Sequence, residues 1–321
     1  MNQSLSDKHQ AALAQLLQQA RWSDAEIRTR LQQALSPDYW AALNPQLAVN
    51  QNEGDIEIER PVSELSEREQ WCAQLASEGY FQTAPLIAAP VIECLRQGIE
   101  VLRAAGWPPL FAFIYDECWR VMRGPAMTGL LTAVLGAGYQ QMAQVYTFYV
   151  QAGGSGWFPH VDYGPARRLT LWLALSDATL ENGCLYLIPR HRTPPTIAEN
   201  FSKLESVSYA DLLTLLHNCR AVPAPTGTLL GWGNDLIHWG AHARPMAKPR
   251  ISLAMNFVAA DFKPAASDLP LLLDARQLPT LAQRLRIIAH AIEYARDYAP
   301  WTHKYLDFAK RLIAAVEQSV P

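Results

Sequence analysis

Short, strongly apolar segments dominate the chain between residues 140 and 260. They are rich in β-branched and aromatic residues, and turn sequences such as GGSG (153–156) and ENG (181–183) separate them. The segments cover residues 144–150, 168–175, 184–189, 227–232 and 251–258. This pattern is typical of antiparallel strands in a sandwich or jelly roll, so we predict a double-stranded β-helix of the cupin type.

Helical periodicity flanks this β region on both sides. Ser23 and Glu26 form an S-x-x-E capping box, and Ser36-Pro37 would end the helix that follows. Further helices are predicted from Ser66 to Gly79, from Pro90 to Gly106, and along the face shared by Leu281, Leu285, Ile288 and Ile292. We therefore predict a mainly β protein with flanking helices.

We expect residues 1–321 to form a single domain with three parts. Residues 1–60 would be an N-terminal helical extension, with its best linker at 50–55. Residues 75–262 would be the jelly-roll core with its leading helices, and residues 265–321 a C-terminal helical extension.

Composition narrows the classes of partner. The formal net charge of the 321 residues is only −3, so no basic surface for nucleic acid is indicated. No uncharged apolar run approaches the roughly 20 residues that a membrane helix needs, and the polar N-terminus resembles no signal peptide. The five cysteines are scattered without a C-x-x-C pair, which favours a reduced compartment. We expect a cytoplasmic monomer or homodimer without a nucleic-acid or membrane partner.

The stretch W-F-P-H-V-D-Y (157–163) contains the first candidate for chemistry. Residues two apart on a strand point to the same side, so His160 and Asp162 would present two potential metal ligands together. The alternative is a chance pair at the entry to a hairpin, because such short motifs often match by accident.

A second histidine favours the interpretation that His160 and Asp162 bind a metal. His238 follows a turn at residues 231–235 and enters a predicted strand, and a jelly roll can bring it beside His160 and Asp162. Two histidines and one carboxylate on one face of a metal leave positions open, which is the ligand set of non-haem Fe(II) oxygenases. A closed structural zinc site would need four protein ligands, commonly including cysteine.

Arg250, twelve residues after His238, adds a candidate anion site. It opens a predicted strand in an R-x-S unit with Ser252, and a guanidinium fork suits the far carboxylate of 2-oxoglutarate. Arg244 competes for this role but does not open a strand. On the strand at 144–150, Thr147 and Tyr149 share a face, and we predict that they face the cosubstrate, with plain core packing as the alternative.

Residues 75–260 resemble the phytanoyl-CoA dioxygenase family. The likeness includes L-A-S-E-G-Y-F (75–81), the H-x-D at His160, the segment 169–189 with its Asn-Gly turn, and the distal His238 with Arg250. The resemblance implies Fe(II), 2-oxoglutarate as cosubstrate and O₂, and it places Trp172 beside the cosubstrate. Pro-Arg-His-Arg at 189–192 and Ala243 depart from the family pattern near the rim of the site, where they bear on the substrate more than on the metal.

The remaining candidates concern the substrate, which we expect to be a small molecule. Ten tryptophans favour an apolar or aromatic compound, although a large core also consumes tryptophan. The segment 190–222 is a candidate lid. Candidate substrate contacts are Trp157, Tyr163, Arg192 and Trp239.

Asp162 also bears on the type of reaction. Related halogenases have a small residue at this position, so its presence favours hydroxylation, while ring formation, desaturation and demethylation would use the same ligands. Two other classes remain as alternatives: a cupin-like metal isomerase or hydrolase without O₂ chemistry, and a catalytically silent binding protein.

Overall fold

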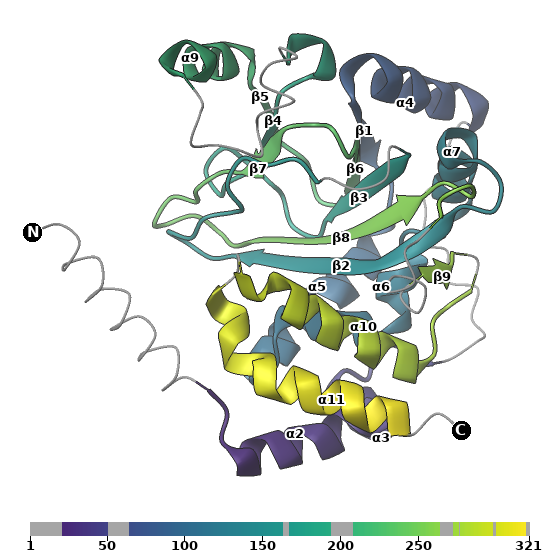
Figure 1. Ribbon diagram of the computed structural model, residues 1–321, viewed down its shortest axis with the longest axis vertical. Coiled ribbons are helices and arrows are strands. Elements are labelled where there is room, and N and C mark those ends of the chain that lie inside the picture. Colours follow the sequence, from purple (N-terminus) through teal and green to yellow (C-terminus); the bar gives the residue numbers. More distant parts are fainter. Residues whose placement is uncertain are drawn as a thin grey trace, which may run out of the picture. The chain divides into compact units, whose positions relative to one another are not determined.

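In the computed structural model, one predicted strand (184–189) lies in the smaller of two antiparallel sheets, and the other four lie in the larger one (Figure 1). Its six strands run in the order β1-β6-β3-β8-β2-β9, so neighbours in the sheet come from distant parts of the sequence. They are β1 (Tyr80–Pro85), β6 (Thr228–Gly233), β3 (Arg168–Ala174), β8 (Arg250–Val258), β2 (Gln140–Val150) and β9 (Leu272–Asp274).

The minor sheet consists of three short strands in the order β5-β4-β7. They are β5 (Arg220–Val222), β4 (Leu185–Leu187) and β7 (His238–Gly240). A buried cluster joins the two sheets, because Trp172, Leu230 and Ala254 of the major sheet pack with Leu185 and Leu187 of β4. Two antiparallel sheets that enclose a core in this way confirm the predicted jelly roll.

The structure describes residues 21–50, 64–162, 167–193, 208–263, 272–275, 277–297 and 300–318. The chain divides into two compact units, one of Met1–Asn50 with Pro279–Pro321 and one of Gln51–Leu278. The second unit contains both sheets. Within the described residues, no helix is both long and apolar enough to cross a bilayer.

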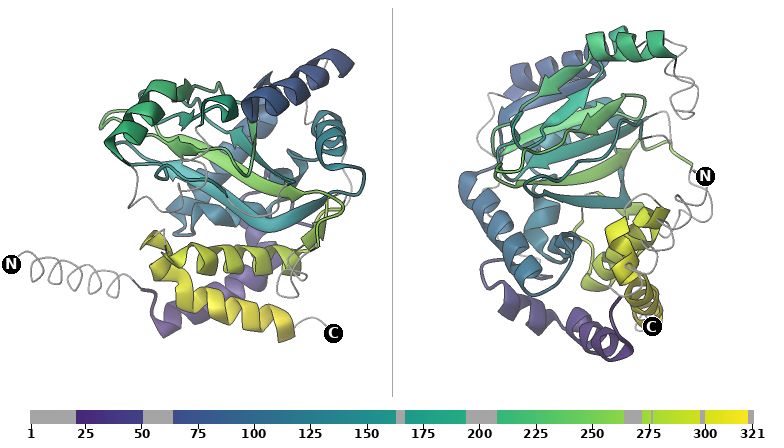
Figure 2. Two further views of the ribbon diagram at one scale, coloured as in Figure 1. Left: turned by 45° about the horizontal axis from the view of Figure 1, so that its top comes forward. Right: turned by 90° about the vertical axis from the view of Figure 1, so that its left-hand side faces the viewer.

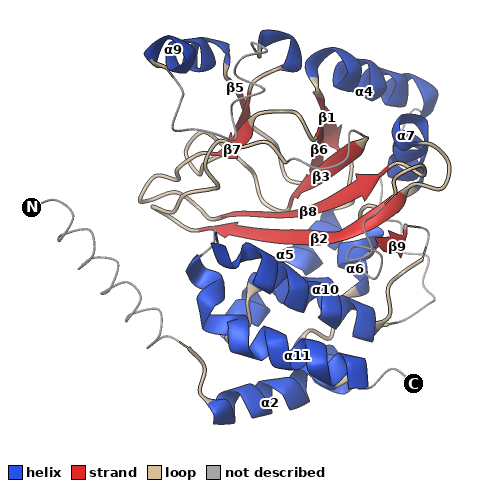
Figure 3. Cartoon of the chain, in the orientation of Figure 1, coloured by secondary structure: helices blue, strands red, loops and turns tan. Residues whose placement is uncertain are grey.

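Helices cover the outer side of the major sheet in the Gln51–Leu278 unit. Figures 2 and 3 show α5 on the side of β2 that faces away from the minor sheet, and α9 next to the minor sheet. Tyr149 of β2 ties the sheet to α5 by donating a hydrogen bond of 2.8 Å to Glu100. The helices of this unit are α4 (Glu64–Glu78), α5 (Ala89–Ala104), η1 (Pro109–Ile114), α6 (Asp116–Arg120), α7 (Pro125–Leu135), η2 (Arg190–Arg192) and α9 (Tyr209–Asn218).

The other unit is helical among its described residues. Its capping box is confirmed, because Ser23 accepts a hydrogen bond from the backbone of Glu26 while Glu26 accepts one from the backbone of Ser23. Pro37 takes the first position of the next helix, where its missing N–H costs nothing. The elements are α2 (Asp24–Leu35), α3 (Pro37–Leu43), α10 (Leu281–Tyr294), η5 (Ala295–Asp297), η6 (Pro300–Tyr305) and α11 (Leu306–Gln318).

The Asn182-Gly183 turn leads into β4 and has no room for a side chain. Gly183 has a φ of +79°, and a Cβ there would lie 2.3 Å from the carbonyl oxygen of Ala241. We expect Gly183→Ala to lower the free energy of unfolding by more than the roughly 1–2 kcal/mol of a left-handed backbone alone. Gly138→Ala is the matched control, because it has a φ of +87° but its nearest neighbour would lie at 3.7 Å. Urea denaturation checks this, and equal losses for the two variants would contradict it.

Candidate active site

His160 and His238 are neighbours because their backbones pair directly. The N–H of each donates to the carbonyl of the other, and both distances are 3.0 Å. In such a reciprocal antiparallel pair, the two side chains leave the backbone on the same side. The ring centroids consequently lie 4.3 Å apart, although the two residues are far apart in the sequence.

Each imidazole is oriented by a backbone carbonyl two residues earlier. His160 Nδ1 lies 2.8 Å from the oxygen of Phe158, and His238 Nδ1 lies 3.0 Å from the oxygen of Leu236. A carbonyl only accepts, so we assign the ring proton to Nδ1, which leaves the Nε2 lone pair of each ring for a ligand. Burial, helped by the charge of His238, lowers the pKa of His160 to about 4, so the ring is neutral at pH 7.

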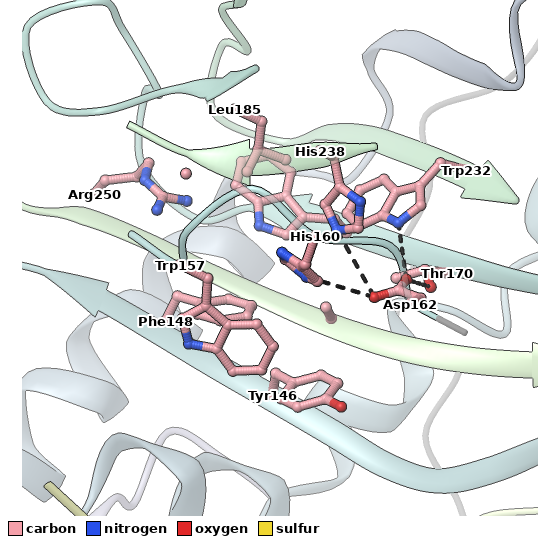
Figure 4. Close-up of a pocket in the computed structure, with 13 residues that line it drawn as sticks. Tyr146, Phe148, Trp157, His160, Asp162, Thr170, Leu185, Trp232, His238 and Arg250 are labelled. Atoms are coloured by element: carbon pink, nitrogen blue, oxygen red, sulfur yellow. Dashed lines mark hydrogen bonds and ion pairs between the residues drawn. The ribbon is translucent and has the colours of Figure 1, made fainter. Parts of the chain in front are cut away.

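Asp162 completes a cluster of three potential metal ligands (Figure 4). Its Oδ1 lies 3.7 Å from Nε2 of His160 and 3.8 Å from Nε2 of His238. Burial alone would raise the pKa of Asp162. The charges of His238 and Arg168, followed by the hydrogen bond from Thr170, outweigh burial and hold this pKa below its ordinary value. The ligand atoms of all three side chains lie within 4.8 Å of one another, close enough to share one ion.

The donor set suits a first-row transition metal with open positions. Two imidazoles and one carboxylate provide three ligands, without a thiolate and without the fourth protein ligand of a structural zinc site. Within the described ranges, this is the one group of three or more His, Cys, Asp or Glu side chains that converges in this way.

Arg250 lies in the same pocket as the three ligands and is almost fully buried, with 1% of its surface exposed. Burial lowers its pKa to about 10, so it still carries a positive charge at pH 7. Among the described residues, its Nε has no hydrogen-bond partner, and neither do Oγ of Ser252 and Nε1 of Trp172. In the register of β3 and β8, Trp172 is opposite Ala254 and Ala174 is opposite Ser252. The side chains of Trp172 and Ser252 therefore lie on the same, interior face of these two strands.

Arg244, the competitor for this role, lies elsewhere. It is largely exposed and forms an ion pair of 2.7 Å with Glu181. The structure therefore places Arg250, and not Arg244, beside the histidines.

The prediction that Thr147 and Tyr149 face the cosubstrate is wrong. Tyr149 points to the outer side of β2, where its hydroxyl binds Glu100 and the guanidinium of Arg103 lies 3.5 Å from the centroid of its ring. Thr147 shares that face by the alternation of the strand. Tyr146 and Phe148 line the pocket instead.

The candidate substrate residues fall into different places. Trp157 lines the pocket, with its ring 5.3 Å from that of Tyr146 and 5.4 Å from that of Phe148. Trp239 does not line it, because its ring stacks on Tyr186 at 5.6 Å. Arg192 lies outside the pocket lining and is exposed beside His191.

Two further predictions concern residues that the structure does not describe. Tyr163 lies outside the described residues, as do residues 194–207 of the proposed lid at 190–222.

Sequence reasoning missed the residues that hold the carboxylate of Asp162. Its Oδ2 accepts hydrogen bonds from Thr170 at 2.6 Å and from Nε1 of Trp232 at 2.9 Å. Arg168 is buried and donates to the backbone carbonyl of Asp162 at 3.2 Å. Thr170 could have been found from its position, because it lies two residues before Trp172 and therefore on the same face of the predicted strand.

Comparison with solved structures supports the fold. The chain resembles SnoK, described as a non-haem α-ketoglutarate-dependent carbocyclase from nogalamycin biosynthesis, with a TM-score of 0.50 and 17% identity over 67% of this chain and 92% of that chain. It also resembles the epimerase SnoN (TM-score 0.48, 16% identity, 61% and 84%) and EctD from S. alaskensis (0.46, 16%, 67% and 86%). At these identities, the likeness to SnoK shows a shared fold.

Comparison of sequences finds one family model that matches part of the chain. No curated protein is detectably similar to the chain. The family model of phytanoyl-CoA dioxygenase (PhyH) matches residues 110–250, a range that contains His160, Asp162, His238 and Arg250. The resemblance inferred from the motifs is confirmed over this range, because residues 110–250 match the family model of phytanoyl-CoA dioxygenase.

Proposed function

We propose that the protein is a non-haem Fe(II)/2-oxoglutarate-dependent dioxygenase that hydroxylates a small molecule. One observation carries this proposal: a three-ligand metal cluster and a buried arginine whose Nε has no partner among the described residues line the same pocket. The family match and the jelly-roll fold support it.

His160, Asp162 and His238 would hold the metal, and Arg250 would hold the far carboxylate of 2-oxoglutarate. When both are bound, they supply oxygen activation, with succinate and CO₂ as co-products of substrate oxidation. Ser252 and Trp172 offer two further buried donors near Arg250. A carboxylate in this place would satisfy three donors that otherwise lack partners among the described residues, and buried donors without partners are costly.

The proposed anion site also separates this function from a cupin-like hydrolase or isomerase. Such an enzyme needs the metal ligands but has no use for a buried cation beside them. A buried charge without a counter-ion costs several kcal/mol. An arginine with 1% of its surface exposed therefore favours an anionic cosubstrate in the pocket.

The substrate side of the pocket favours an apolar or aromatic compound. Apart from the metal ligands and Arg250, the lining contains no charged side chain among the described residues, and Tyr146, Phe148 and Trp157 contribute three aromatic rings. Asp162 fills the position that halogenases leave small, which favours hydroxylation over halogenation.

The test is anaerobic addition of 2-oxoglutarate to the protein loaded with Fe(II). We expect a weak visible metal-to-ligand charge-transfer band, because the keto acid would chelate the metal. After admission of O₂ we expect succinate, measured by mass spectrometry, together with a hydroxylated product once a substrate is supplied from a library of apolar metabolites. Absence of both the band and succinate would reject the proposal in favour of the cupin-like alternative.

A further inference from the structure

The carboxylate of Asp162 is held asymmetrically. Both side-chain donors, Thr170 and Trp232, bind Oδ2, while Oδ1 faces the two imidazoles. Figure 4 shows the two kinds of contact on the two sides of this carboxylate. The two oxygens of one side chain are thus given different tasks.

The two donors form one unit of the sheet. Thr170 of β3 and Trp232 of β6 are directly opposed in the register of the antiparallel pair, so the distance between them is fixed by backbone hydrogen bonds. Trp232 also contacts the second histidine, because its ring centroid lies 4.6 Å from that of His238. A single cross-strand pair therefore orients one ligand and packs against another.

Thr170 also contacts a buried polar residue, Asn256. Its hydroxyl lies 2.6 Å from Oδ1 of Asn256, a fully buried residue that accepts a hydrogen bond of 3.3 Å from Nε of Arg168. A hydroxyl has one proton, which these two acceptors share, and a carboxylate accepts more strongly than a neutral amide, so we assign the stronger hydrogen bond to Asp162. The charge of Arg168 then lies close to the carboxylate without taking either of its oxygens.

We propose that Thr170 and Trp232 are positioning residues that restrict Asp162 to binding the metal through Oδ1 alone. This inference rests on the proposed function. A carboxylate that is free to turn can offer both oxygens to a metal and would then occupy a position that the cosubstrate needs. Two donors on Oδ2 prevent this, and they keep three protein ligands and three open positions.

The test measures Co(II) binding and the visible spectrum of the Co(II) form, without turnover. Thr170→Val keeps the shape of the side chain and removes the donor, and Trp232→Phe removes the other donor. We expect each to weaken Co(II) binding about tenfold, as loss of a partner outside the metal ligands typically does. We also expect each to change the Co(II) spectrum, because the coordination of the ion changes, and to weaken binding of 2-oxoglutarate to the Co(II) form.

Two controls separate positioning from general damage. Thr170→Ser keeps the hydroxyl and is expected to keep the wild-type affinity and spectrum. Thr228→Val makes the same change at a fully buried hydroxyl of β6 that has no partner among the described residues, so it is expected to leave Co(II) binding unchanged. If Thr170→Val does not fold, Trp232→Phe and Thr170→Ser still give opposite expected results.

The outcomes distinguish this inference from the proposed function. Wild-type Co(II) affinity and an unchanged spectrum in Thr170→Val and Trp232→Phe would overturn the positioning role. The same changes in Thr170→Ser or Thr228→Val would also overturn it, because they would show a general effect of packing. If the wild-type protein binds Co(II) but never 2-oxoglutarate, the proposed function fails, while the effect of the two donors on metal coordination is still measured.

Discussion

Replacement of either His160 or His238 by alanine is expected to abolish metal binding. Each histidine would supply one of only three protein ligands, and its Nε2 already faces Oδ1 of Asp162 at less than 4 Å. Loss of a partner outside the ligand set typically costs 10- to 100-fold in metal affinity, so loss of a ligand should cost more than roughly 100-fold. Calorimetric titration with Co(II) or Fe(II) under anaerobic conditions measures this directly.

His242→Ala is the matched control for these variants. His242 lies four residues after His238, but it is exposed and its Nδ1 lies 2.9 Å from the hydroxyl of Ser155. We therefore expect wild-type metal affinity in this variant. Wild-type affinity in His160→Ala or His238→Ala, or a large loss in His242→Ala, would show that the metal is held elsewhere.

The H-x-D pair and the distal histidine could be found in the sequence because backbone geometry links them to simple spacing. Side chains two apart on extended chain share a side, so His160 and Asp162 were expected together. The contribution of His238 was visible only through the jelly-roll pattern and the family resemblance. Its pairing with His160 is a contact between distant segments, which no local pattern encodes.

The face of β2 that lines the pocket could not be predicted, because side chains pack on both faces of this strand. Tyr146 and Phe148 face the pocket while Tyr149 packs on α5, so aromatic residues occur on both faces and alternation gives no direction. The short strands β5 and β9 were missed for a related reason. Three residues are too few to show a period of two.

The hydrogen-bond partners around Asp162 could not be predicted from the sequence either. Thr170, Trp232 and Asn256 come from three different strands, and none belongs to a recognisable motif. Their convergence depends on the register of β3 with β6 and β8, where Thr170 is opposite both Trp232 and Asn256. Register is set by the whole sheet, so this part of the site required the structure.

Arg250 is the residue whose loss should most clearly separate the proposed dioxygenase from its rivals. Its guanidinium is buried in the pocket, and the β2–β8 register sets it opposite Val150 at the start of β8. A bidentate contact between arginine and carboxylate in such a place is worth about 1.5–3 kcal/mol. Loss of this contact corresponds to a rise of about one to two orders of magnitude in the 2-oxoglutarate requirement.

The measurement is succinate formation against 2-oxoglutarate concentration for the wild type, Arg250→Ala, Arg250→Lys and Arg244→Ala. Arg250→Lys should recover only part of the loss, because an ammonium is a point charge without the planar fork. Arg244 is exposed and paired with Glu181, so Arg244→Ala should behave as the wild type. Metal affinity should be unchanged in all three variants, since neither arginine is a ligand. A large shift in Arg244→Ala without one in Arg250→Ala would show that the anion binds outside this pocket, because Arg250, and not Arg244, lines the pocket with the three ligands.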